Sequence, residues 1–216
     1  MIIWDLPLRL FHWSLMICVF GAIATGKAQL WDVHERFGLA IMALVTFRIL
    51  WGFIGSQTAR FSTFLKGPKQ VWQSFISLAK KQTSDRAGHS PLGGYATIAL
   101  LLIPLFMAVT GSFSTDDILF DGPFYHVMPQ WAQQAGQLHH FGEKLVFLII
   151  LLHVGALSYY WFALRKNLIR PMIKGKGQAT GPSGALSVKR TIMGLVLLVL
   201  FNLIAQYATT LRPDYF

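Results

Sequence analysis

Long hydrophobic stretches dominate the pattern along this chain, and five of them have the length of a membrane-spanning helix. A helix needs about 20 mostly apolar residues to cross the hydrocarbon core of a bilayer. The predicted spans are Leu10–Gly26, Phe37–Ile54, Gly93–Gly111, His139–Leu164 and Thr191–Tyr207. The pattern therefore predicts an all-α integral membrane protein. We expect a helical bundle of four core transmembrane helices and a fifth, C-terminal one.

Two segments between the spans have patterns of their own. Residues 64–79 carry apolar side chains at helical spacing among Lys and Gln, which is typical of an amphipathic helix lying on a membrane surface. Gly67–Pro68 indicates that this helix begins at the proline. Residues 180–187 are rich in Gly, Ser and Pro and predict a flexible linker. We therefore expect a transmembrane domain over residues 1–175, followed over 176–216 by a linker and the additional helix.

The composition agrees with a lipid-facing protein. Hydrophobic residues make up 54% of the 216 positions and charged residues only 13%, about half the usual share. A soluble chain of this kind would expose a large apolar surface to water. The single cysteine, Cys18, excludes a disulfide scaffold. The first apolar run also resembles a signal peptide, but Asp5, His12 and Trp13 interrupt its start, so we expect it to stay as a span.

The positive charge is concentrated in two loops, which sets the expected topology. Residues 55–92 and 165–190 contain most of the Lys and Arg in loops, namely Arg60, Lys66, Lys69, Lys80, Lys81, Arg86, Arg165, Lys166, Arg170, Lys174, Lys176, Lys189 and Arg190. Residues 112–138 hold no Lys or Arg, but they hold Asp116, Asp117 and Asp121. The positive-inside rule then predicts a cytoplasmic N-terminus and a C-terminus on the far side of the membrane. The net charge of +10 is explained by topology and anionic lipid, so we expect no nucleic-acid partner.

Histidines carry the candidate chemistry, because ionisable side chains inside a membrane are costly and usually functional. His139 and His153 lie 14 residues apart in the fourth span. At about 100° per residue, 14 residues fall about 40° short of four full turns, so both share one helix face, about 21 Å apart. The neighbouring His140 falls about 140° away from that face. One face therefore presents one histidine near each side of the membrane.

Each of these two histidines has a partner at matching depth on another span. His12 begins the first span on the cytoplasmic side and pairs with His153, whereas His34 begins the second span on the far side and pairs with His139. Two stacked pairs of imidazoles are what two b-type haems require as axial ligands. Zinc fits less well, since it takes four ligands converging on one point. Without a Cys-x-x-Cys-His motif, covalent c-type attachment is excluded.

The histidines lie in motifs that resemble a known family. The matching stretches are Trp4-Asp5-Leu6-Pro7-Leu8-Arg9-Leu10-Phe11-His12-Trp13, His34-Glu35-Arg36-Phe37-Gly38 with Arg48 and Trp51, His89-Ser90-Pro91-Leu92-Gly93-Gly94, and Leu138-His139 with His153-Val154-Gly155-Ala156. Over about residues 3–175 the chain resembles the bacterial cytochrome b561 / nickel-hydrogenase cytochrome b family. The resemblance implies a bundle with two haems b whose ligands fall on His12, His34, His139 and His153.

The resemblance also implies a function in a respiratory chain. We expect a cytochrome of the bacterial inner membrane that moves electrons between quinone and a periplasmic partner, either a c-type cytochrome or a hydrogenase-like oxidoreductase subunit. One alternative is a self-contained superoxide:quinone oxidoreductase, and another is a haem-free anchor or transporter. A transporter usually shows inverted repeats or broken helices, and the sequence shows neither. Whether the chain forms a homo-oligomer is open.

Three arginines are candidates for binding haem propionates, which are anionic and suit a bidentate guanidinium. These are Arg9, Arg36 and Arg48. Snorkelling to the membrane surface also explains Arg9 and Arg36, and remains open for Arg48 inside its apolar run. The roles of His89, His126 and His140 are not assigned by the pattern.

Overall fold

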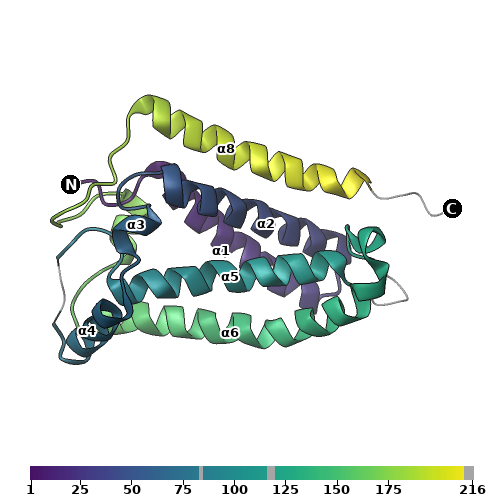
Figure 1. Cartoon of the computed structure of the whole chain (residues 1–216), viewed down its shortest axis with the longest axis horizontal. Helices are drawn as coiled ribbons and strands as arrows, with labels where there is room; N and C mark the ends of the chain where they lie inside the picture. Colours follow the sequence, from purple (N-terminus) through teal and green to yellow (C-terminus); the bar gives the residue numbers. More distant parts are fainter. Residues whose placement is uncertain (83–84, 116–119, 212–216) are drawn as a thin grey trace. The chain divides into compact units, whose positions relative to one another are not determined.

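The computed structural model describes residues 1–82, 85–115 and 120–211. Five long helices account for most of these residues: α1 (Leu6–Lys27), α2 (Trp31–Ile54), α5 (Pro91–Phe113), α6 (Ala132–Phe162) and α8 (Val188–Tyr207) (Figure 1). All five have the length and hydropathy of membrane-crossing helices. Apart from isolated bridges, the described ranges contain no β-structure. The prediction of an all-α membrane helical bundle with five spans is confirmed.

Most of the long helices begin earlier than the apolar runs predicted. The second span was expected from Phe37, yet α2 begins at Trp31; the fourth was expected from His139, yet α6 begins at Ala132. The first turns of α2 and α6 contain polar side chains, so a search for apolar runs does not include them. Asp32 lies in the first turn of α2, where a negative charge is favourable next to the positive end of the helix dipole. These extensions place His34 and His139 inside helices.

Short helices occupy the connections. These are α3 (Phe61–Phe64), α4 (Pro68–Ala79), α7 (Ile169–Lys174), and the 3₁₀ turns η1 (Tyr125–Val127), η2 (Pro129–Trp131) and η3 (Ala208–Leu211). Helix α4 begins at Pro68, as predicted, because proline at the first helical position loses no hydrogen bond that the helix would make. Residues 180–187 lie outside any helix, and the flexible linker expected there stays a prediction.

The chain forms two compact units, and each long helix contributes a piece to both. The first unit comprises residues 1–10, 48–100 and 149–195. Its interior contains the fully buried Trp51, against which Gly194 of α8 packs so closely that a Cβ there would lie 2.6 Å from the indole. Arg190 adds a hydrogen bond to the Ile54 carbonyl at the end of α2. Both contacts tie the start of α8 to the end of α2.

The second unit comprises residues 11–47, 101–148 and 196–216, of which 11–47, 101–115, 120–148 and 196–211 are described. Close helix contacts occur at two glycines: Gly21 of α1 faces the Phe37 ring, and Gly142 of α6 faces Met107. Small residues allow such an approach between membrane helices. Gln206 of α8 donates a hydrogen bond of 2.9 Å to the Arg36 carbonyl on α2.

Candidate functional site

The second unit brings the rings of His34 and His139 close together in an edge-to-face arrangement. His34 lies in the first turn of α2, and His139 lies in the second turn of α6. Their ring centroids are 6.0 Å apart, and the two ring planes are nearly perpendicular, at 89°. The pairing of these two histidines was predicted from depth alone, and the structure places them together.

Each ring of this pair is oriented by a backbone carbonyl. His34 Nδ1 lies 2.8 Å from the Ala22 carbonyl of α1, and His139 Nδ1 lies 3.0 Å from the Met107 carbonyl of α5. A carbonyl oxygen only accepts, so each Nδ1 carries the proton. In the neutral ring this leaves the Nε2 lone pair available to a metal. Histidines that ligate metals are commonly held in this way.

The spacing of the pair fits one metal ion between the two rings. A metal–nitrogen bond is about 2 Å long, and the ring centre lies about 1 Å beyond the nitrogen, so two ligands on opposite sides place their ring centroids about 6 Å apart. Among the described residues, no three His, Cys, Asp or Glu side chains gather into a metal-binding group. Haem iron, which needs only two protein ligands, fits this donor set.

Glycines make room for the two rings. A Cβ on Gly26 would lie 3.0 Å from His34 Nδ1, and a Cβ on Gly111 would lie 2.8 Å from His139 Cε1. Gly38, one turn after His34, has open space where its Cβ would be. A cavity reaches the pair and is lined by residues from α2, α5 and α6, among them His34, Gly38, Met107, Gly111 and His139.

The other predicted ligands lie on the expected helices. His12 is in the second turn of α1, with its ring 5.3 Å from that of Trp13, and His153 is in the second half of α6. They belong to different units of the chain. The pairing of His12 with His153 therefore stays a prediction.

Three further histidines have no role assigned by the sequence pattern. The His140 ring lies 6.4 Å from that of His139 and lines the same cavity. His126 lies in the turn η1. His89 sits between two aromatic rings, Trp4 and Phe64, each 4.8 Å away between centroids.

The three candidate arginines have different surroundings. Arg36 is exposed. Arg9 donates to the Ile173 carbonyl at 2.5 Å, and its Nε is buried without a hydrogen bond. Arg48 does not snorkel: it is only 1% exposed, donates to the Ala59 carbonyl at 3.1 Å and lies over the Phe61 ring. Its Nη1 is also buried without a hydrogen bond.

Sequence reasoning missed the role of Asp5. This carboxylate is 3% exposed and caps α1 by accepting from the Leu8 amide at 2.8 Å. It also accepts from the Ser56 hydroxyl at 2.5 Å and from the Trp51 indole at 3.2 Å. An Asp just before an apolar run is an N-cap signal, so the cap was readable, but its long-range partners were not.

The acidic loop is described only in part. Asp116 and Asp117 lie outside the described residues, and the Asp121 carboxylate accepts a hydrogen bond of 2.6 Å from the Thr115 hydroxyl. Glu143, one turn after His139, forms an ion pair with Lys27 of α1. Both acids lie in the second unit.

Comparison with known proteins identifies a family that matches most of the chain. The family model described as prokaryotic cytochrome b561 matches residues 3–175. Two relatives carry the name "Probable Ni/Fe-hydrogenase 1 B-type cytochrome subunit", one from Escherichia coli strain K12 and one from Escherichia coli O157:H7. Each is 22% identical over 204 aligned residues, covering 77% of this chain and 83% of the relative. No solved structure matches.

The family match covers all 7 histidines of the chain and four of the five long helices. Of the five long helices, only α8 lies beyond the matched range. The imidazoles of His34 and His139 are suitable ligands for haem b, the cofactor of a b-type cytochrome. The chain therefore belongs to the prokaryotic cytochrome b561 family and is a multi-pass membrane cytochrome of the b type, which carries haem b and transfers electrons.

Proposed function

We propose that this protein is a di-haem cytochrome that moves electrons between membrane quinone and a redox partner protein. One haem b is held by His34 and His139, and a second by His12 and His153. The observation that carries the proposal is the facing pair His34 and His139, with both Nδ1 protons used on backbone carbonyls. Bound haem supplies reversible one-electron chemistry at its iron.

The chain's own residues supply ligation, orientation and exclusion of water. His34 and His139 come from different helices, so packing of α2 against α6 sets their separation. The carbonyls of Ala22 and Met107 fix the ring tautomer, which keeps Nε2 as the ligating nitrogen. Both rings are partly buried, and this lowers the access of water to the iron.

The second pair rests on the helix register. Residues 139 and 153 lie in one unbroken helix, so the face argument applies to both. In the first unit, Arg9 and Arg48 each keep one buried N–H donor without a partner. We propose that these donors serve the propionates of the second haem, and that the exposed Arg36 serves the first, since carboxylates suit a guanidinium.

The partner and the location are also proposals. The two named relatives are cytochrome subunits of a hydrogenase, which favours an oxidoreductase partner for this chain over a stand-alone enzyme. The charge pattern supports a cytoplasmic N-terminus and a periplasmic C-terminus in a bacterial inner membrane. The partner then docks on the periplasmic side, where Asp121 lies.

Variants of adjacent histidines test the proposal. His34→Ala and His139→Ala should each lose the same haem, measured by pyridine haemochrome content and by the reduced-minus-oxidised spectrum of the purified protein. His140→Ala is the matched control and should keep full haem content. Loss of haem in His140→Ala with retention in His139→Ala would refute the ligand assignment. Superoxide-driven quinone reduction by the protein alone would refute the need for a partner.

A further inference from the structure

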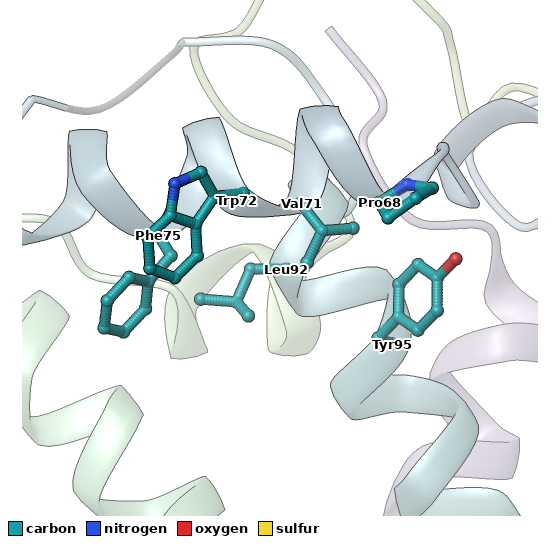
Figure 2. A pocket seen from close by; sticks show the side chains of 6 residues that line it. All are labelled: Pro68, Val71, Trp72, Phe75, Leu92 and Tyr95. Carbon is teal, nitrogen blue, oxygen red and sulfur yellow. The ribbon is translucent and has the colours of Figure 1, made fainter.

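An apolar groove lies in the first unit, whereas the histidine pair belongs to the second. It is a cavity of about 360 Å³ between α4 and the first turns of α5. Figure 2 shows side chains of α4 directed toward Leu92 and Tyr95 of α5. The complete lining is Pro68, Val71, Trp72, Phe75, Leu92 and Tyr95. The family match and the haem proposal leave this groove without a role.

The apolar lining of the groove suits a hydrocarbon chain. Trp72 is 63% exposed and Phe75 is 50% exposed, and their rings stack with centroids 5.7 Å apart. Of the lining side chains, only Trp72 and Tyr95 carry a polar atom, and the Tyr95 hydroxyl donates to the Lys66 carbonyl at 3.0 Å. A quinone headgroup needs hydrogen-bond donors at its carbonyls, which this lining barely offers. An acyl chain needs none.

The basic residues around the groove favour a lipid with an anionic headgroup. Residues 55–82 contain Arg60, Lys66, Lys69, Lys80 and Lys81 and no Asp or Glu. On the helical wheel Lys69 and Lys80 fall on the same flank of α4, at the border of the apolar stripe, about 16 Å apart. Both are exposed. Basic residues beside an amphipathic helix attract anionic lipid.

A hydrogen bond also attaches helix α4 to α6. The Tyr159 hydroxyl of α6 donates to the Leu78 carbonyl of α4 at 3.2 Å. We propose that the groove is a binding site for an anionic phospholipid, with one acyl chain between Trp72 and Leu92 and the phosphate near Lys69, while Lys80 adds to the positive potential on the same flank. A bound lipid of this kind would anchor the basic loop to the cytoplasmic leaflet.

Quenching of Trp72 fluorescence tests the lipid site. The full chain is reconstituted into nanodiscs with bromine-labelled phosphatidylglycerol or phosphatidylcholine, and the Trp72 signal is taken as the difference between wild type and Trp72→Phe. Phosphatidylglycerol should quench Trp72 at a roughly fivefold lower mole fraction than phosphatidylcholine. Lys69→Gln with Lys80→Gln should remove this preference, whereas Lys174→Gln with Lys176→Gln should keep it. Equal quenching by both lipids, no quenching, or quenching by added quinone alone would overturn the proposal.

A second inference concerns how the histidine pair is held, and it rests on the proposed haem ligands. The carbonyl that orients His34 belongs to Ala22, and the carbonyl that orients His139 belongs to Met107. Each is followed three residues later by threonine and four residues later by glycine: Thr25-Gly26 in α1 and Thr110-Gly111 in α5. The two helices thus present the same local sequence pattern to the two rings.

The threonine geometry is repeated as well. Thr25 donates to the Gly21 carbonyl at 2.7 Å and approaches the Ala22 carbonyl at 3.3 Å. Thr110 donates to the Phe106 carbonyl at 2.8 Å and approaches the Met107 carbonyl at 3.2 Å. In both helices the hydroxyl therefore competes for the carbonyl that accepts the histidine Nδ1–H, and in α5 the Thr110 hydroxyl also lies 3.4 Å from His139 Nδ1 itself.

We infer that Thr25 and Thr110 are positioning residues that set the strength of these two histidine hydrogen bonds. A hydroxyl donating to the same carbonyl weakens it as an acceptor for Nδ1–H. Without the hydroxyl, the Nδ1–H bond strengthens and the imidazole becomes a more basic ligand. A more basic ligand stabilises the ferric state, so the midpoint potential of that haem falls.

Redox titration of threonine variants tests this inference. Thr110→Val should lower the midpoint potential of one haem at unchanged haem content, and Thr110→Ser should restore it. Thr97→Val is the matched control, because Thr97 makes the same kind of bond, to the Gly93 carbonyl, in the part of α5 that belongs to the first unit. An unchanged potential in Thr110→Val would overturn the inference. Full haem content in His139→Ala would instead overturn the ligand assignment on which it rests.

Discussion

At the scale of single residues, the site depends on two imidazoles and on the backbone atoms that hold them. A histidine near the end of a membrane span is commonly only an interfacial polar group. In this protein two such residues face one another at 6.0 Å, and each has its Nδ1 bonded to a helix carbonyl. With Nδ1 protonated in each neutral ring, the lone pair of Nε2 is the one available to the haem iron that we propose at this pair.

The glycine next to each ring leads to a first prediction. Gly111→Ala puts a methyl group 2.8 Å from the His139 ring, closer than real Cβ contacts allow, so the ring must move away from the Met107 carbonyl. We expect loss of at least half of the haem bound at this pair, measured by pyridine haemochrome. The control is Gly93→Ala on the same helix, where the new methyl group meets the Ser90 hydroxyl at 3.2 Å and the His89 Cβ at 3.9 Å. Equal haem content in both variants would contradict the close packing of Gly111 against His139.

The second prediction concerns His12 and His153, which belong to different units of the chain. His153→Ala should lose one haem and keep the other, because the two pairs are independent in the proposed arrangement. The reduced-minus-oxidised spectrum of the purified variant should keep the band of the haem held by His34 and His139. If both haems persist, His153 is not a ligand.

At the scale of elements, the buried network around Asp5 links the start of α1 to the end of α2. One carboxylate caps α1 and receives hydrogen bonds from Ser56 and Trp51. Removing a helix cap costs about 1 kcal/mol, and leaving buried donors unpaired costs about 1–3 kcal/mol more. The network therefore contributes to the stability of the first unit rather than to the chemistry of the histidine pair.

A stability measurement follows from this network. Asp5→Ala should lower the thermal unfolding midpoint of the detergent-solubilised protein, with a loss of about 2–4 kcal/mol. Asp5→Asn, which keeps an acceptor oxygen for the cap, should lose less. Asp32→Ala in the first turn of α2 removes an exposed acid and serves as the comparison for loss of charge alone. A midpoint equal to wild type in Asp5→Ala would show that the carboxylate does not stabilise the fold.

The ends of the helices show which features of the fold could be predicted from the sequence and which could not. The number of spans followed from apolar runs, and the start of α4 followed from Pro68. The starts of α2 and α6 did not, because their first turns are polar and are stabilised by dipole and packing effects that hydropathy ignores. The pairing of His34 with His139 was predictable because helix register and loop charge fix depth. The carbonyls of Ala22 and Met107 were not, since they depend on how α1 and α5 pack against the rings.

At the scale of the whole molecule, the orientation that we propose for the chain in the membrane depends on five candidate membrane-crossing helices and on the charge of the loops between them. The loops at 55–92 and 165–190 carry the basic residues, and the loop at 112–138 carries none. Under the positive-inside rule, the basic loops face the cytoplasm. The two proposed haems then lie one near each side, which is the arrangement that transmembrane electron transfer requires.

Topology is tested with reporter fusions. Alkaline phosphatase, which is active only outside the cytoplasm, should be active when fused after residue 207 and inactive when fused within residues 176–186. A fluorescent protein that matures only in the cytoplasm should give the reverse result. Swapped activities at the two positions would invert the assigned orientation.

The ratio of haem to polypeptide in the purified protein tests the central claim most directly. Protoporphyrin-bound iron, counted by pyridine haemochrome against protein determined by amino-acid analysis, should reach two per chain after expression with ample haem supply. A ratio of one would contradict the second pair, His12 with His153. A colourless protein under the same conditions would contradict the whole account.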